Sequence, residues 1–229
     1  MRTPKGVPYC IDTTEVTQGQ YEVFRAAGVP ISEQPHTLCN AQRNPSFDPE
    51  IIPGIPDMGP ICEATDYSPT PTPNAPVVCV TFCDAVGYCA WAGKRLCGVV
   101  GRPGETFGDW RDEGSEWNVL KNDPEYDEWY NTCSGGGERE YPYGTESEPE
   151  RCPVSYEPHP ECAVEGTEPP VLAILGGVSE HLDFCSDDGY CYGPGEATGG
   201  AADASCSKEL VPAGANRYTG FRCCYEFEE

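Results

Sequence analysis

The sequence predicts an α+β fold with little regular secondary structure and many disulfide bonds. Its 229 residues include 26 glycines and 24 prolines, a composition typical of turns rather than long helices. Fifteen cysteines run through the whole chain, while only 38% of the residues are hydrophobic, so we expect disulfides to supplement a modest core. Two short segments also carry clear helix start and stop signals. A few short elements joined by long loops are therefore expected.

The clearest helix is predicted over residues 17–27. Thr17 and Gln20 form a capping box, because each side chain can bond the backbone amide of the other. Gly28 follows and permits the left-handed conformation that ends a helix. These local signals define both ends of this helix.

A second helix is predicted over residues 81–92. Thr81 is the expected N-cap, Asp84 suits the positive end of the helix dipole, and Gly93 ends the segment. The remaining elements are less marked, namely a helix over residues 115–120 and strands over residues 7–11 and 219–225.

Residues 29–76 are predicted to be irregular because eleven prolines interrupt them. Cys39 and Cys62 are expected to pin this stretch, for example by bonding to each other, although residues 70–73 also resemble a linker. The acidic run over residues 123–128 is expected to be a solvated loop; the alternative is a patch for a sugar or a cation, formed together with Trp129 and Tyr130. From residue 133 onward we expect loops and short strands.

The charge balance excludes several classes of partner. Lys and Arg number 14 against 38 Asp and Glu, which gives a net charge of −24 and argues against nucleic acid or an anionic membrane. The longest hydrophobic run, residues 171–175, is too short to span a bilayer. The opening residues contain no hydrophobic export signal, so a secreted protein is expected to be a processed form.

The cysteines indicate an oxidising compartment. They form no Cys-x-x-Cys pair, and the histidines are far apart, so a zinc ribbon or thioredoxin site lacks its motif. A disulfide framework in a secreted or cell-surface protein remains. Because fifteen is odd, at least one thiol is expected to be free or to join two chains. The adjacent Cys223 and Cys224 should bond to different partners, since neighbouring strand residues face opposite ways.

Four segments, in order, resemble motifs of the sulfatase-modifying-factor family, which includes formylglycine-generating enzyme. Residues 9–21 contain Ile-Asp-x-x-Glu-Val-Thr, and residues 76–96 contain Asp-Ala-x-x-Tyr-Cys-x-Trp-x-Gly-Lys-Arg-Leu. Further on stand Glu-Trp with Tyr-Pro-x-Gly, and a closing Gly-Phe-Arg at residues 220–222. The resemblance implies an irregular α+β fold related to C-type lectins, forming one domain over residues 1–229. Extra cysteines such as Cys97 suggest a secreted, cysteine-rich branch.

The resemblance also shows what is missing from the active site. Formylglycine-generating members hold copper with two cysteines five residues apart, after an Arg-Gly-Gly-Ser strand. Here Cys206 stands alone, with Val211 five residues later, Ala201 five residues earlier, and Thr198 in place of the Arg. Cys206 is the one candidate catalytic residue, as half of a copper site. The alternative is a disulfide from Cys206 to Cys223 or Cys224, and we expect no copper.

Family members also bind calcium, partly through a Gly-Asn-Val-x-Glu turn. The corresponding residues predict a calcium site made by Glu180 with the carbonyl groups of Gly177 and Val178. Gly177 replaces the Asn ligand, so the alternative is a plain turn in which Glu180 caps backbone amides. Ser179, Glu180, His181 and Asp183 are residue types of a catalytic triad, but adjacency in sequence does not create triad geometry.

The sequence therefore indicates a secreted, non-catalytic binding or structural module of this family. We expect a protein or glycan partner at the cell surface, or self-association through an unpaired cysteine. One alternative is a cysteine-dependent oxidoreductase that generates formylglycine in sulfatase-type peptides, with Cys206 at its site. Another is a calcium- or carbohydrate-binding lectin-like module. All three inferences rest on analogy of fold.

Overall fold

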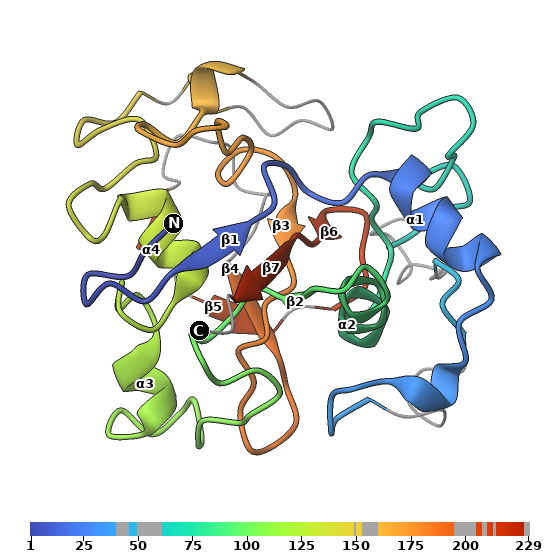
Figure 1. The fold of residues 1–229 in the computed structure, drawn as a ribbon, viewed down its shortest axis with the longest axis horizontal. Helices are drawn as coiled ribbons and strands as arrows, with labels where there is room; N and C mark the ends of the chain where they lie inside the picture. The colour runs from blue at the N-terminus through green and yellow to red at the C-terminus, as the bar shows by residue number, and fades with distance from the viewer. Residues whose placement is uncertain are drawn as a thin grey trace.

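The computed structural model describes residues 1–39, 46–49, 61–148, 150–152, 160–194, 205–207, 210–212 and 214–226 (Figure 1). Its helices are α1 (Gln18–Ala26), α2 (Phe82–Trp91), α3 (Glu116–Leu120) and α4 (Glu128–Ser134), with two 3₁₀ turns at Ile31–Glu33 and Pro160–Cys162. Its strands are β1 (Tyr9–Ile11), β2 (Arg95–Leu96), β3 (Ser179–Glu180), β4 (Tyr192–Pro194), β5 (Leu210–Pro212), β6 (Thr219–Gly220) and β7 (Cys223–Glu226). The predicted α+β class with little regular structure is confirmed.

A small antiparallel sheet lies at the centre of the molecule (Figure 1). Within it β7 runs between β1 and β2, and Cys224 lies opposite both Ile11 and Arg95. The described residues also form a parallel pair, β3 with β6, and an antiparallel pair, β4 with β5. The last strand of the chain is therefore the central strand of the sheet, and it joins the beginning of the chain to the segment after α2.

The predicted helix starts are confirmed. Thr17 and Thr81 each make a capping box, with Gln20 and Asp84 respectively, and the Ser115 side chain accepts a hydrogen bond from the Asn118 amide. These caps satisfy backbone amides that the first helical turn leaves without a partner. The two longer helices thus begin where their local sequence predicts.

The predicted acidic loop over residues 123–128 is wrong at its end. Asp127 is the N-cap of α4 and accepts a hydrogen bond from the Tyr130 amide, while Glu128 and Trp129 are buried. An acidic residue is favourable at a helix start, and the Trp129 ring adds buried area to the core. A solvated loop and a capped helix share the same acidic sequence, and burial distinguishes them.

Seven disulfides and the free Cys10 account for all fifteen cysteines. The pairs are Cys39–Cys83, Cys62–Cys79, Cys89–Cys223, Cys97–Cys224, Cys133–Cys206, Cys152–Cys162 and Cys185–Cys191. The adjacent Cys223 and Cys224 do take different partners. The expected Cys39–Cys62 bond is wrong, because each of these cysteines joins the segment around α2. The expected bond from Cys206 to Cys223 or Cys224 is also wrong.

Two large groups of buried side chains form the core of the described residues. One surrounds α1 and α2 and contains stacked Tyr21 and Tyr88 rings with Phe24 and Phe221 at their edges. The other lies around α3 and α4, where the Trp117 ring meets the rings of Phe184 and Tyr192. The central sheet contributes residues to both groups.

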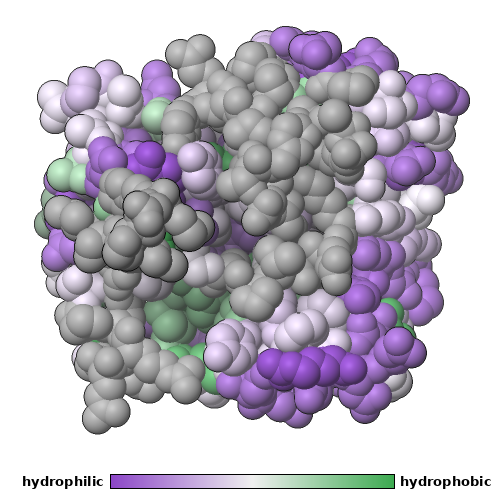
Figure 2. Space-filling view, turned by 180° about the vertical axis from the view of Figure 1, so that it is seen from behind, coloured by the Kyte–Doolittle hydropathy of each residue, from purple (hydrophilic) through white to green (hydrophobic). Residues whose placement is uncertain are grey.

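The described surface is largely hydrophilic when the molecule is seen from behind, with hydrophobic residues showing in a recess at the lower left (Figure 2). Among the described residues, no helix is both long and hydrophobic enough to cross a membrane.

Candidate functional site

Cys206, the candidate catalytic residue, carries no thiol in this structure. Its sulfur is bonded to Cys133 of α4, and its backbone amide donates to the carbonyl group of Glu140. Thr198 and Ala201, which stand where the family has its Arg-Gly-Gly-Ser strand, lie outside the described residues. Copper(I) is held by soft sulfur ligands, and a disulfide offers no thiolate. The donors present at Cys206 therefore do not fit a copper site.

Cys10 is the one cysteine outside the disulfides, and it is exposed on β1 opposite Tyr225. No second thiol exists with which it could form a thiolate pair, because the other fourteen cysteines are bonded. Cys10 therefore retains the expected role of a free thiol, open to a bond between chains.

The predicted calcium turn is built around an arginine. Glu180 is 1% exposed, and its two carboxylate oxygens accept hydrogen bonds of 2.8 and 2.9 Å from the Nε of Arg222. The Arg222 guanidinium also donates to the backbone carbonyl groups of Asp12 and Leu172. A cation at this turn would have to displace Arg222 from Glu180. Calcium binding by Glu180, Gly177 and Val178 stays a prediction that has this competitor.

Gly177 stands where the family has its Asn ligand. A Cβ atom at this position would lie 2.0 Å from the Oε1 of Glu15, so a side chain here would require the buried Glu15 carboxylate to shift. The same Glu15 oxygen accepts a hydrogen bond from the Val178 amide. Burial raises the pKa of Glu15 to about 7, the Arg222 charge opposes this rise, and Glu180 adds to it. The turn thus holds two buried carboxylates around one guanidinium.

No catalytic triad forms among Ser179, Glu180, His181 and Asp183. His181 is buried, its Nε2 donates to the carbonyl group of Val80, and burial lowers its pKa to about 4. Asp183 instead bonds His36, from a distant part of the chain. The four residues therefore serve different neighbours.

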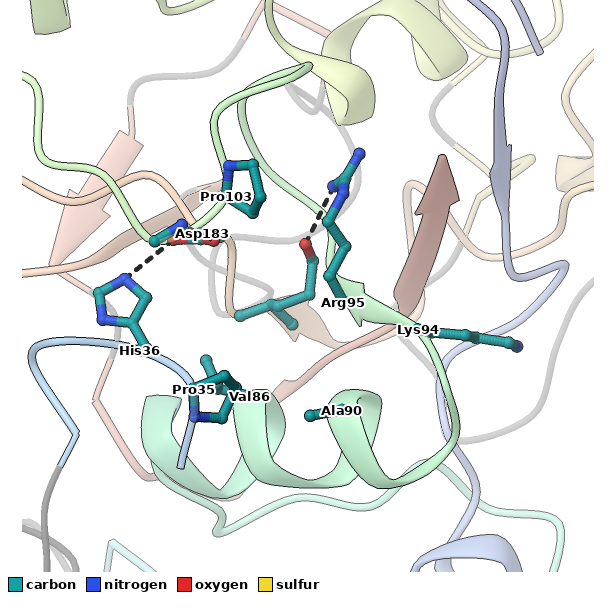
Figure 3. A pocket seen from close by; sticks show the side chains of 10 residues that line it. Pro35, His36, Val86, Ala90, Lys94, Arg95, Pro103 and Asp183 are labelled. Atoms are coloured by element: carbon teal, nitrogen blue, oxygen red, sulfur yellow. Dashed lines mark hydrogen bonds and ion pairs between the residues drawn. The ribbon is translucent and has the colours of Figure 1, made fainter. Parts of the chain in front are cut away.

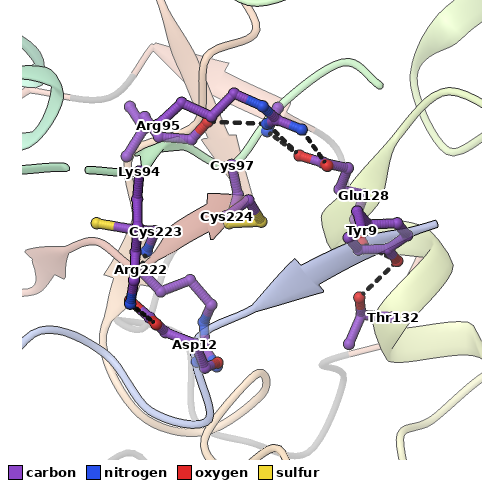
Figure 4. The surroundings of a disulfide bond; sticks show 12 residues. Tyr9, Asp12, Lys94, Arg95, Cys97, Glu128, Thr132, Arg222, Cys223 and Cys224 are labelled. Carbon is purple, nitrogen blue, oxygen red and sulfur yellow. Dashed lines mark hydrogen bonds and ion pairs between the residues drawn. A yellow bond between two sulfur atoms is a disulfide. The ribbon is translucent and has the colours of Figure 1, made fainter. Parts of the chain in front are cut away.

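Near the sheet, Cys97, Cys224 and Glu128 lie close enough to resemble a metal site (Figure 4). The two sulfurs are bonded to each other, and the Glu128 carboxylate is held by Arg95 at 2.7 Å and by the Gly98 amide at 3.0 Å. Burial raises the pKa of Glu128, and Arg95 opposes this rise. All donors of the group are committed, so it is a structural anchor of α4.

A cleft of about 430 Å³ opens between α2 and the loop that contains Pro103 (Figure 3). Drug-sized ligands occupy clefts of this size, lined mainly by hydrophobic side chains with a few polar groups. Its lining comes from five parts of the chain, namely Pro35, His36, Val86, Ala90, Lys94, Arg95, Leu96, Pro103, Gly104 and Asp183.

The polar end of the cleft is a histidine–aspartate pair. The His36 Nε2 lies 3.1 Å from the Oδ1 of Asp183, and the Leu38 amide donates to the His36 Nδ1 at 3.1 Å. Because Nδ1 is an acceptor, the proton of the neutral ring lies on Nε2, which donates to Asp183. Neither ring nitrogen is free to take a proton from a substrate. The His36 ring therefore holds Asp183 in place through its Nε2.

The second oxygen of Asp183 accepts a hydrogen bond of 2.7 Å from the Gly104 amide. The side chain of Asp183 is only 6% exposed, yet within the described ranges no lysine or arginine pairs with it. Its nearest possible metal partner, Cys185, is bonded to Cys191. Asp183 is thus a nearly buried carboxylate held by neutral donors at the end of a hydrophobic cleft.

Sequence reasoning missed this cleft. His36 stood out only as one of three scattered histidines, and Asp183 only as a residue type of a triad. They are 147 positions apart in the sequence, and no motif links them. The one local signal was Pro35 beside His36 in a proline-rich loop, which does not define a partner.

The comparison with family models agrees with the motifs. The model of the sulfatase-modifying factor enzyme 1-like domain matches residues 3–164, more than half of the sequence, and the chain belongs to this family. The mixed α+β structure with seven disulfides is consistent with the C-type-lectin-like fold expected for it. A comparison with curated proteins found no match.

Proposed function

We propose that this protein is a non-catalytic binding module of the sulfatase-modifying-factor family, acting in an oxidising extracellular setting. The observation that carries the proposal is the state of the cysteines. Fourteen of fifteen are in disulfides, and the remaining Cys10 has no thiol partner. Copper-dependent oxidation of a substrate cysteine needs a pair of thiolates, which this arrangement does not supply.

The disulfide content supports the proposed compartment. Bonds of this kind persist in secreted and cell-surface proteins and are rare where glutathione and thioredoxin keep thiols reduced. The net charge of −24 also suits a solvated extracellular protein.

The cleft supports binding rather than catalysis. Its His36 ring uses both nitrogens in hydrogen bonds, and Asp183 accepts from two fixed donors. Fixed polar groups beside hydrophobic walls are typical of a ligand-binding site.

A thiol count with an oxidation assay tests the proposal. The unreduced protein is denatured and alkylated, and the labelled cysteine is mapped by mass spectrometry. We expect one label, on Cys10. In parallel, the copper-loaded protein is incubated with a cysteine-containing sulfatase-type peptide, and we expect no aldehyde. Labelling of Cys206 together with aldehyde formation would establish the oxidoreductase alternative instead.

Calcium dependence separates the binding module from a calcium-dependent lectin. An ion that binds only the folded state raises the Tm of the protein. Because Arg222 already occupies the Glu180 carboxylate, we expect the same Tm with calcium and with a chelator. A rise of Tm with calcium that is absent in the Glu180→Gln variant would favour the lectin-like alternative.

A further inference from the structure

We propose that the cleft binds a lysine side chain of a partner protein, with the ammonium group at Asp183 and the alkyl stem along the hydrophobic walls. The inference rests on the proposed binding function and adds the chemistry of the ligand. The argument depends on the charge of Asp183, the walls of the cleft and the charges at its mouth.

Asp183 supplies a negative charge with no described lysine or arginine beside it. Its two hydrogen-bond donors are the Gly104 amide and the His36 ring, whose Nδ1 accepts from the Leu38 amide. Aspartate side chains buried to this degree are almost always paired with a cation or metal. Within the described part of the chain His36 is the ion-pair partner of Asp183, and no lysine or arginine lies at ion-pair distance. A cation that enters the cleft would satisfy this carboxylate.

The walls fit the stem of a lysine. Val86 and Leu96 are buried beneath the cleft, and Pro35, Ala90 and Pro103 line its more open part (Figure 3). Lysine places its four methylene groups along hydrophobic surface while its ammonium group reaches a polar partner. A hydrophobic passage that ends in a carboxylate is also the design of trypsin's specificity pocket.

The cations at the mouth do not oppose this ligand. Lys94 pairs with Asp12, and Arg95 pairs with Glu128 and Glu226, so each is neutralised within the molecule. The whole protein carries a net charge of −24, which attracts a basic partner and raises its rate of association. Charge complementarity therefore favours a lysine-bearing surface.

The geometry of Asp183 favours an ammonium group. Each carboxylate oxygen already accepts one hydrogen bond, from His36 on one side and from Gly104 on the other. One lone pair remains on each oxygen; an ammonium group needs only one of them, whereas the paired contact of an arginine fork needs both remaining lone pairs to face the cleft. Lysine is therefore the expected ligand.

Binding of short peptides tests the proposal. The probes are a fluorescent acetyl-Gly-Gly-Lys-Gly-Gly-amide and its norleucine counterpart, which keeps the stem and lacks the charge. We expect the lysine peptide to bind about tenfold more tightly or better, because a hydrogen bond to a charged group is at stake. We also expect this difference to shrink as salt is added. Equal affinity of the two peptides would overturn the proposal.

Three variants locate the binding. Asp183→Asn removes the charge with little change of shape and should abolish the preference for lysine. Ala90→Trp places a large ring in the cleft from an exposed helix position and should abolish binding. Its control, Val23→Trp, alters a side chain on α1 that is 60% exposed and lies outside the cleft, and it should bind as the wild type does. Unchanged lysine affinity in Ala90→Trp would contradict the assignment.

A further arm separates a protein ligand from a free amine. n-Butylammonium has the stem and charge of lysine without a backbone, and we expect it to bind at least tenfold more weakly than the peptide. Equal affinity would overturn a protein partner. The probes contain no cysteine, so this result is independent of the oxidation assay that tests the proposed function.

Discussion

Glu180 and Asp183 lie three residues apart, and both carboxylates are almost completely buried, yet their surroundings differ. Glu180 is bound by Arg222, which also holds the backbone at Asp12 and Leu172. Asp183 is bound by neutral donors and faces the cleft. The first region is closed around its arginine ion pair, whereas the second opens on the cleft and has no described lysine or arginine beside its carboxylate.

The comparison teaches that burial alone does not assign a role to an acidic residue. A buried carboxylate that is fully paired joins distant segments, and loss of its partner leaves a charge with no solvent. A buried carboxylate held by neutral donors keeps its capacity to bind a cation. The partner, rather than the exposed fraction, distinguishes a structural group from a recognition group.

The largest expected effect comes from removal of the arginine. Arg222→Met keeps much of the side-chain volume but leaves Glu180 and Glu15 without a cation, and should lower the free energy of unfolding by about 3–5 kcal/mol. Urea denaturation measures this loss. The control is Arg111→Met, an exposed arginine that pairs with Asp188, for which we expect a much smaller loss because solvent screens the pair. Equal losses in the two variants would contradict the contrast.

A smaller effect is expected at Gly177. In Gly177→Ala the new methyl group collides with the Glu15 carboxylate, and we expect a loss of about 1–3 kcal/mol. Gly214→Ala is the matched control, because a Cβ atom there meets nothing within 4 Å. Denaturation midpoints that fall equally in both variants would show that Glu15 moves aside without cost.

The same turn predicts a dependence on pH. Burial raises the pKa of Glu15 to about 7, and burial also raises the pKa of Asp127 to about 7 despite its backbone hydrogen bonds. Both carboxylates ionise near pH 4 in the unfolded chain, so the folded state takes up protons first as the pH falls. These two carboxylates should therefore contribute a rise in stability of about 1.5 kcal/mol between pH 8 and pH 6.5.

The titration of His181 and the Glu15→Gln variant help to assign the change in stability to particular groups. His181, whose pKa burial lowers to about 4, opposes this contribution near the acid end of the window, because it is already half protonated in the unfolded chain at pH 6.5; it offsets about 0.4 kcal/mol. Glu15→Gln should remove about half of the contribution of the two carboxylates. Stability that is flat or that falls over this range would mean that Glu15 is ionised throughout.

The smallest effect on stability is expected at Asp183. Asp183→Asn keeps an oxygen for the Gly104 amide and weakens the bond to His36, so we expect a loss of about 1 kcal/mol. The change in urea midpoint should be far below that of Arg222→Met. A loss as large as that one would make Asp183 a structural group and remove the contrast.

Local signals predicted the parts of the fold that depend on near neighbours. Thr17, Thr81 and Ser115 define helix starts by bonds to amides three residues away, and all three helix starts were found from the sequence. The start of α4 at Asp127 was missed, because its acidic run also fits a loop. Only the packing of Trp129 in the core decides between the two.

Contacts between distant segments could not be predicted from local sequence patterns. The alternation of side chains in a strand predicted that Cys223 and Cys224 take different partners, but it did not identify Cys89 and Cys97. The cleft shows the same limit, since His36 and Asp183 meet only in the folded chain. The spacing of these residues in the sequence does not predict that they lie in contact.

The disulfides of β7 have a consequence for how the chain matures. Cys223 and Cys224 cross-link the strand to α2 on one side and to the residue after β2 on the other. A slip of one residue in strand register would turn each sulfur toward the other's partner. Thiol–disulfide exchange reopens bonds that form in a wrong register, so oxidative folding should favour the register in which each sulfur meets the cysteine on its own face. A disulfide isomerase that acts on the nascent protein would in effect be aligning its central strand.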